Sequence, residues 1–264
     1  MWKGTMEEYF ELYEVASNYL KEKFPNLKIG GPAYAGRSEW LDRFLEYISQ
    51  DGKKVPLDFF SWHCYCSTVE TIYELSAAMR SKLDEYGFFE TESILNEWNY
   101  IKSWDEFVYS VKQIISIKGA AFTAACMCGA QNDTMIDMLM YYDTRPSVFN
   151  GVFDFYTYEK LKGYYPLYWY GMFYDMETCV KCTETPENVY GICGVDKDGK
   201  VMAVVSHYSE NDETPAIDVA VDFGKEGKYE IYRVDNDHDG ELIGTTSNLE
   251  FNLPLHSFIL IKEI

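Results

Sequence analysis

The chain has 264 residues, 47% hydrophobic and 17% aromatic, which is enough apolar material for one large or two modest domains. Its 43 acidic and 23 basic residues give a net charge of −20, which excludes nucleic acid and anionic membranes as main partners. Met1 is followed by no signal-peptide pattern, no apolar run is long enough to span a membrane, and seven cysteines, an odd number, cannot all pair within one chain. We therefore expect a reduced, cytoplasmic protein.

Helices and strands are predicted to alternate up to about residue 176. Amphipathic spacing predicts helices, and short apolar runs ended by glycine, proline or polar clusters predict strands. The predicted helices cover residues 7–24, 39–50, 68–86, 103–119 and 164–174, and the predicted strands cover 27–32, 55–65, 93–98 and 121–129. Such alternation is typical of βα units, which form a parallel sheet with right-handed crossovers.

The pattern changes after residue 176. Short alternating strands are predicted at residues 188–195, 201–208, 217–221, 228–233 and 258–262, separated by turn sequences. These features predict an antiparallel β-sandwich. The expected domains are therefore a β/α domain at residues 1–176 and a sandwich at residues 177–264.

Glu97 lies near the end of the third predicted strand and is followed by Trp98, Asn99 and Tyr100. Parallel barrel strands carry catalytic side chains at their carboxyl ends. A carboxylate beside an indole and an amide suits sugar chemistry, because it combines an anionic oxygen, a flat apolar face and hydrogen bonds to hydroxyls. The alternative is a surface glutamate at a strand end.

The preceding strand carries a second polar end. Period-two alternation places His63 and Tyr65 on one face of their strand, and Glu97 and Asn99 on one face of theirs. His63 could instead be a hydrogen-bonded core histidine. Gln131 follows the fourth predicted strand and completes the candidate substrate-binding set.

Three strand-end motifs resemble glycoside hydrolase family 39, the β-xylosidase and α-iduronidase family of the (β/α)8 clan. They are GGPA at residues 30–33, SWHCY at residues 61–65 and LNEWNY at residues 95–100. The resemblance covers about residues 5–175 and extends to the sandwich by architecture alone. It implies that Glu97 is the nucleophile of a retaining enzyme, that Tyr65 lies near it, and that His63 lies near a sugar hydroxyl or the acid/base.

Two departures from the family pattern stand out. The acid/base motif, of the type W-N-E-P-N, is absent, and the chain starts just past the place where it would stand, although retaining hydrolysis needs two carboxyl groups ~5–5.5 Å apart. Cys126, Met127 and Cys128 occupy the predicted eighth strand, where the family places an aromatic sugar platform. The expected fold class is thus α/β, a partial (half) (β/α)8 barrel followed by a C-terminal antiparallel β-sandwich.

An open half-barrel leaves apolar sheet edges exposed. The chain could be a fragment of a longer enzyme, one half of a split pair, or a homo-oligomer in which a second copy closes the barrel. In the last case Asp133 or Asp137 of the second copy could approach the acid/base position. The alternative function is a non-catalytic, self-associating or vestigial carbohydrate-binding protein.

No cofactor and no metal are expected. Alternating Asp235, Asp237 and Asp239 indicate either a calcium loop or, more simply, a solvated hairpin turn. Three cysteines with His207 could bind zinc, but unbound thiols are the simpler interpretation; these cysteines are Cys179, Cys182 and Cys193. Asp143 and Arg145 either line a sugar subsite or pair to hold their loop.

Overall fold

Parallel β/α units form the first part of the chain. The computed structural model describes residues 2–36, 38–53 and 55–264. They divide into two units: unit 1 comprises Met1–Cys64, Glu74–Trp98 and Met135–Tyr141, and unit 2 comprises Tyr65–Tyr73, Asn99–Thr134 and Tyr142–Ile264.

Unit 1 is built around a four-stranded sheet in the order β1-β2-β3-β4. Its strands are β1 (Gly30–Tyr34), β2 (Phe59–Cys66), β3 (Glu92–Tyr100) and β4 (Met138–Tyr141), with β1–β2 and β3–β4 pairing in parallel. The helices between the first strands are α2 (Ser38–Ser49) and α3 (Val69–Glu85), and α1 (Met6–Lys23) precedes them. The predicted β/α alternation is confirmed over these elements.

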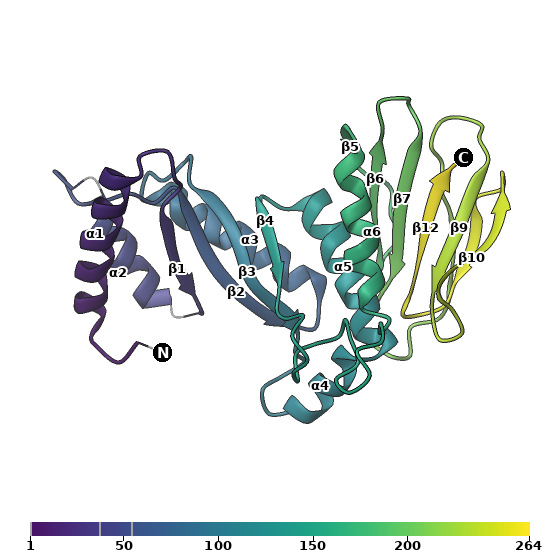
Figure 1. The fold of residues 1–264 in the computed structure, drawn as a ribbon, viewed down its shortest axis with the longest axis horizontal. Coiled ribbons are helices and arrows are strands. Elements are labelled where there is room, and N and C mark those ends of the chain that lie inside the picture. Colours follow the sequence, from purple (N-terminus) through teal and green to yellow (C-terminus); the bar gives the residue numbers. More distant parts are fainter. Residues whose placement is uncertain (1, 37, 54) are drawn as a thin grey trace. The chain divides into compact units, whose positions relative to one another are not determined.

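Helix α1 illustrates why the helices in this part of the chain could be predicted from the sequence. It starts at a capping box, in which Thr5 and Glu8 satisfy each other's backbone N–H groups. Its inner face packs against α2, with Phe10 and Phe44 ring centroids 5.6 Å apart, and Figure 1 shows the two helices side by side. Its outer face is apolar as well: the exposed side chains there are Leu12, Val15, Tyr19 and Leu20.

The prediction of a strand at residues 121–129 is wrong, because this segment lies within α5 (Ile117–Asp133). Every residue from Lys118 to Ala130 is buried, so the helix has no polar face and no readable period. The strand that follows β3 in the sheet is instead β4, in a segment predicted as loop. The predicted helix at residues 103–119 is also broken, into α4 (Phe107–Ile114) and the start of α5.

Small residues let α5 pack closely. A Cβ on Gly129 would lie 2.2 Å from the Tyr73 hydroxyl oxygen. No single described helix is long and apolar enough to cross a membrane; only α4 and α5 together pass that test of length and composition, and a 77° bend separates them.

The β-sandwich prediction is confirmed in unit 2. A six-stranded sheet has the order β10-β9-β12-β7-β6-β5, and β11 pairs with β8 in a second, two-stranded sheet. The strands are β5 (Thr178–Val180), β6 (Val189–Val195), β7 (Val201–His207), β8 (Ile217–Ala220), β9 (Tyr229–Val234), β10 (Asp239–Thr246), β11 (Glu250–Leu253) and β12 (Ser257–Glu263). The sequence did not predict three of these strands, which are β5, β10 and β11.

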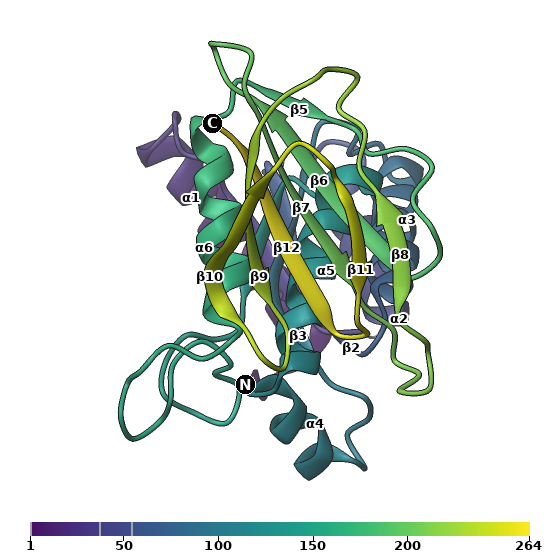
Figure 2. The same ribbon diagram turned by 90° about the vertical axis from the view of Figure 1, so that its right-hand side faces the viewer.

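The six-stranded sheet is covered on both faces. Figure 2 shows β8 and β11 in front of it, where Val205, Val219 and Ile259 belong to one apolar core. On the other face the Ser206 hydroxyl donates to the Ala121 carbonyl of α5 (3.1 Å). There Trp169, of α6 (Tyr164–Met172), also packs edge-to-face on Phe258; the turn Phe173–Asp175 then leads into β5. A helix of the β/α part therefore shares its core with the sandwich.

Candidate functional site

The two strand-end groups singled out in the sequence meet in unit 1. Glu97 on β3 and His63 on β2 approach with Oε2 and Nε2 3.5 Å apart, and their side chains are 27% and 20% exposed. Neighbouring parallel strands end at the same edge of a sheet, which is why residues 34 apart in the sequence become adjacent. The pair leaves the carboxylate reachable from solvent, as a nucleophile requires.

Cross-strand hydrogen bonds fix the two strands and β1. The buried Trp62 indole on β2 donates to Ser93 Oγ on β3 (3.0 Å), and the Ala33 amide on β1 donates to Ser61 Oγ (2.9 Å). Ser61 and Trp62 directly precede His63 on β2, and Ser93 lies four residues before Glu97 on β3. These bonds give the pair a rigid support.

Trp98 lies on the opposite face of β3 from Glu97. Trp98 is 1% exposed, and its ring packs edge-to-face on the Tyr141 ring, with the two centroids 5.6 Å apart. The indole is thus part of the core beneath the strand end. A contact between Trp98 and a sugar stays a prediction. The geometry favours a role of Trp98 in supporting the end of β3.

Asn99, 2% exposed, forms hydrogen bonds within unit 2. Its Nδ2 donates to the carbonyl oxygens of Tyr142 and Phe149, and its Oδ1 accepts from the Tyr100 amide. Both amide protons and the carbonyl oxygen are engaged in these bonds. These hydrogen bonds fix the loop after β4, so they assign Asn99 a role in positioning that loop. The predicted contact of Asn99 with substrate is not tested by them.

Tyr65 belongs to an aromatic cluster, defined here as Tyr65, Trp104, Phe107, Tyr142 and Phe149. Its ring centroid lies 5.4 Å from Trp104, 5.6 Å from Phe149 and 6.4 Å from Tyr142. Sequence reasoning singled out Tyr65 but missed Trp104, Phe107 and Phe149. The feature of the sequence that could have revealed Trp104 is its position in the loop directly after β3, the strand that carries Glu97.

The true fourth strand changes one conclusion about the sugar platform. The family departure at Cys126–Cys128 rested on assigning these residues to a strand, and that assignment is wrong because they lie in α5. The strand at that place in the sheet, β4, ends at Tyr141 and is followed by Tyr142. Aromatic side chains therefore do stand at the end of the last parallel strand.

Three other candidates lie away from strand carboxyl ends. Gln131 lies in α5, and its Oε1 accepts a hydrogen bond from the Tyr170 hydroxyl (2.8 Å). Asp133 pairs with Lys181 (3.1 Å). Asp137 accepts a hydrogen bond from the Ser93 amide (2.7 Å), at the amino end of β3, the opposite end from Glu97. Sugar binding by Gln131 stays a prediction.

Asp143 and Arg145 form the structural pair that was one of the two predicted alternatives. Arg145 Nη2 lies 2.8 Å from Asp143 Oδ2, and the Arg145 amide donates to Asp143 Oδ1 (3.1 Å). Asp143 is buried and Arg145 is exposed. The pair closes the turn after Tyr142 and leaves part of the guanidinium open to solvent.

The Asp235 turn, which could have been a calcium loop, is filled by protein groups. Asp235 Oδ1 accepts from the amides of Asp237 (2.9 Å) and His238 (3.0 Å), and Oδ2 pairs with Arg233. Among residues 2–36, 38–53 and 55–264, no three His, Cys, Asp or Glu side chains are placed to hold a metal ion.

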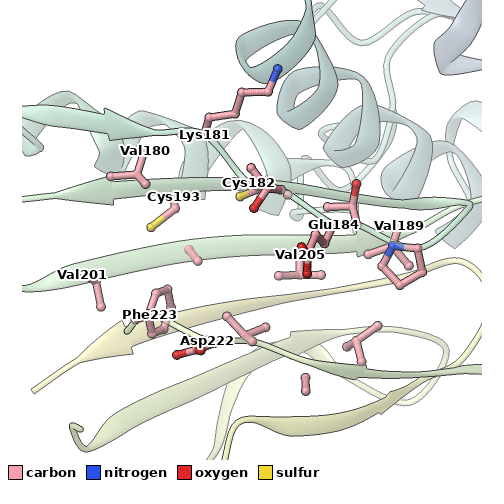
Figure 3. A pocket seen from close by; sticks show the side chains of 18 of the residues that line it. Val180, Lys181, Cys182, Glu184, Val189, Cys193, Val201, Val205, Asp222 and Phe223 are labelled. Atoms are coloured by element: carbon pink, nitrogen blue, oxygen red, sulfur yellow. The ribbon is translucent and has the colours of Figure 1, made fainter. Parts of the chain in front are cut away.

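The sandwich contains an apolar cavity of about 280 Å³. Figure 3 shows its lining, which includes Val180, Cys182, Cys193, Val205 and Phe223. Burial raises the pKa of the Cys193 thiol to about 11, so this thiol is protonated near neutral pH. Most of the lining is apolar, and its charged side chains are Lys181, Glu184 and Asp222.

Parallel β/α units with a carboxylate and an imidazole at adjacent strand ends, followed by a β-sandwich, define a protein of the barrel-type glycoside hydrolase class. The model of the glycosyl hydrolases family 39 matches residues 1–153. The chain therefore belongs to glycosyl hydrolase family 39, as the strand-end motifs implied.

Known relatives share parts of the chain. A 68-residue stretch is 44% identical to a β-xylosidase of Geobacillus stearothermophilus, and covers 25% of this chain and 13% of that protein. A 64-residue stretch is 42% identical to a β-xylosidase of Caldicellulosiruptor saccharolyticus, covering 24% and 12%. The matched stretches thus span only a small part of these curated relatives.

Solved structures share the fold over nearly the whole chain. A glucosidase from Croceicoccus marinus aligns with a TM-score of 0.76 and 22% identity, covering 98% of this chain and 65% of that one. A monomeric β-xylosidase from Caulobacter crescentus CB15 aligns with a TM-score of 0.66 and 16% identity, covering 96% and 64%. The chain corresponds to just under two thirds of each of these proteins, and the predicted fold class, part of a barrel plus a sandwich, is confirmed.

Proposed function

We propose that the chain carries the nucleophile of a retaining β-glycosidase that acts on β-xylosides. The observation that carries the proposal is the solvent-accessible Glu97 carboxylate 3.5 Å from His63, at the strand end where β/α glycosidases do their chemistry. Glu97 attacks the anomeric carbon as the glycosidic C–O bond breaks. Water then releases the sugar from the covalent ester.

His63 and Tyr65 have different roles in this proposal. His63 orients Glu97 and reaches a sugar hydroxyl, and Tyr65 lies two residues further along β2, on the same face. We propose a homo-oligomeric partner as the source of the carboxyl group that protonates the leaving oxygen, because the outer face of α1 is apolar and exposed.

Covalent trapping tests the proposal. Incubation with dinitrophenyl 2-deoxy-2-fluoro-β-xyloside should add one fluoroxylosyl group to Glu97, because this leaving group needs little protonation. Glu97→Gln should prevent labelling, and Glu92→Gln, at the amino end of the same strand, should not. Labelling at another residue, or none in the unmodified chain, would contradict the assignment. A matching glucoside reagent distinguishes the xyloside assignment from a glucosidase activity.

The alternative function, a non-catalytic carbohydrate-binding protein, predicts a different result. Xylose or xylo-oligosaccharide would then bind the unlabelled chain, and binding would survive Glu97→Gln. Calorimetry together with the labelling experiment separates the two functions, because only the enzyme is labelled at Glu97.

A further inference from the structure

We propose that a second cavity of unit 2, beside β5 and β6, binds a neutral aromatic ligand of the phenol class. The cavity has a volume of about 350 Å³, which is within the range of small-molecule sites. Its lining comes from α5, from the end of α6 and the turn after it, and from β5 and β6, and all of it belongs to unit 2. The inference goes beyond the proposed function, because neither Glu97 nor His63 contributes to this cavity.

Strand β6 forms one wall of the cavity. Ile192 lines it there and is 4% exposed, and Gly194 leaves the strand without a side chain two residues further on. A Cβ on Gly194 would lie 2.8 Å from Met176 and 3.0 Å from Phe173. The glycine therefore lets a thioether and an aromatic ring pack directly against the strand, and the wall that results is apolar.

Aromatic rings form much of the remaining lining. The ring centroids of Tyr170 and Phe173 lie 6.4 Å apart, with 43° between the two planes. Tyr174 also lines the cavity but is 92% exposed, so its ring has few contacts with the rest of the chain. An exposed ring beside an aromatic-lined cavity loses its contact with water when it packs on a flat apolar ligand, and this burial favours binding.

Two polar groups of the lining are available to a ligand. Burial raises the pKa of Tyr170 to about 12, so its hydroxyl stays protonated and donates to Gln131 Oε1 (2.8 Å). This bond leaves the amide nitrogen of Gln131 as a donor, and Thr178 adds one hydroxyl. Within the described part of the chain, neither that nitrogen nor that hydroxyl forms a hydrogen bond. A ligand with a single polar edge matches them.

This lining favours a phenol over a sugar. Xylose carries a hydroxyl group on almost every ring carbon, and each hydroxyl buried without a partner weakens binding about tenfold. Gln131 and Thr178 together cannot satisfy such a ring. A phenol has one hydroxyl on an otherwise apolar ring, so the same two groups satisfy it while the ring contacts the aromatic and aliphatic lining.

The charge around the cavity disfavours an anionic ligand. No aspartate, glutamate, lysine or arginine of the described residues lines the cavity. The exposed Asp175 and Glu177 alternate in the sequence with the lining residues Tyr174, Met176 and Thr178. A carboxylate in the cavity would therefore lack a counter-ion and be repelled by its surroundings. We accordingly infer that the phenol is neutral.

Alkylation of Cys179 reports on the occupancy of the cavity. This thiol lines the cavity and is exposed, whereas Cys182 is half-buried and the other five cysteines, all of them described, are buried. Guaiacol, a neutral methoxyphenol, should bind with a Kd on the order of 1 mM, as a ligand of its size allows. At about 10 mM it should slow the reaction of Cys179 with iodoacetamide about tenfold, measured by peptide mass spectrometry.

Three variants locate the bound guaiacol, each compared with and without the ligand. Tyr174→Ala should weaken guaiacol binding about fivefold, because one ring contact is lost, and Gln131→Ala should weaken it as well. Tyr168→Ala is the matched control, since Tyr168 is also exposed but does not line the cavity, and it should keep the full protection of Cys179. The thermal midpoint of each variant checks that the fold is kept.

Several results would overturn the proposal. They are unchanged alkylation in guaiacol, full protection in Tyr174→Ala, and equal protection by benzoate, an anion of similar size. Better protection by xylose would assign the cavity to a sugar, and protection that rises with protein concentration alone would assign it to a second copy.

The strand-end site is tested separately. Protection of Cys179 by guaiacol should survive Glu97→Gln, and its loss in that variant would overturn the proposal. Labelling of Glu97 by the fluoroxyloside is scored on the unmodified chain. Absence of that labelling would contradict the proposed function and leave the phenol site standing, whereas absence of Cys179 protection would do the reverse.

Discussion

At the residue scale, Asn99 shows that a motif predicts the position of a side chain more readily than its hydrogen-bond partners. Asn99 was expected to bind sugar because amides bind hydroxyls. In the structure it is buried and bridges two carbonyl oxygens of the loop after β4. Sequence spacing located the strand end, but the partners of Asn99 lie more than 40 residues away, where no local pattern reveals them.

This network gives a stability prediction. Asn99→Ala should lower the free energy of unfolding by about 1–3 kcal/mol, because the carbonyl oxygens of Tyr142 and Phe149 lose their buried donor. Urea unfolding measures the change. Asn96→Ala on the same strand is the control and should cost less, because the buried Asn96 Oδ1 has no hydrogen-bond partner among the described residues. Equal losses in the two variants would contradict the loop-positioning role.

At the element scale, the sequence predicted those helices and strands that have one buried face. Helices α1 to α3 alternate polar and apolar residues, so their period was visible, and the strand-end motifs located β1 to β3. Helix α5 was missed because it is buried on all sides and so shows no amphipathic period. Strand β4 was missed because it has only four residues, two of which are exposed methionines. Strand β10 was missed because most of its residues are exposed. The His63–Glu97 pair was predictable, whereas Trp104 depended on loop packing.

The close packing of α5 can be tested with glycine substitutions. Gly129→Ala should lower the thermal midpoint and cost about 1–3 kcal/mol, because the new methyl group would clash with Tyr73 and Val69. Gly171→Ala in α6 is the matched control. Apart from its chain neighbours and the backbone of its own helix, no described atom lies within 4 Å of the position that its methyl group would take, so a neutral or slightly stabilising effect is expected. A tolerated Gly129→Ala would show that α3 and α5 pack less tightly than these distances indicate.

The turn between β9 and β10 predicts a pH dependence. Burial alone would raise the pKa of Asp235, but hydrogen bonds from His238 and the Asp237 amide, with the Arg233 charge, hold it below its ordinary value. A lowered pKa in the folded state stabilises the fold above the unfolded pKa of about 3.9, and this contribution disappears as the pH falls through the folded pKa. Urea unfolding from pH 7 to pH 3 should therefore show a steeper loss of stability in the unmodified chain than in Asp235→Asn. Parallel curves of unfolding free energy against pH for the two proteins would contradict a stabilising role of the ionised Asp235.

At the scale of the whole molecule, charge and exposed apolar surface act against each other. A net charge of −20 makes two copies repel, whereas the outer face of α1 favours association. Light scattering should therefore show an oligomer whose population increases with salt, because counter-ions screen the repulsion.

A charge placed on that face tests the site of association. Val15→Glu should shift the chain toward the monomer mass, and Val108→Glu, at an equally exposed valine of α4, should not. A monomer at every salt concentration in the unmodified chain would contradict self-association.

The shared core of α5 and the sandwich also affects how this part of the gene can be exchanged between proteins. Recombination is tolerated where few contacts are cut, and a break near residue 176 would separate the apolar surfaces of α5 from β6 and β7. A junction at residue 176 therefore costs the packing of α5 against the sandwich. Chimeras that join two related enzymes at residue 176 should fold only where the α5 of one parent matches the β6–β7 surface of the other.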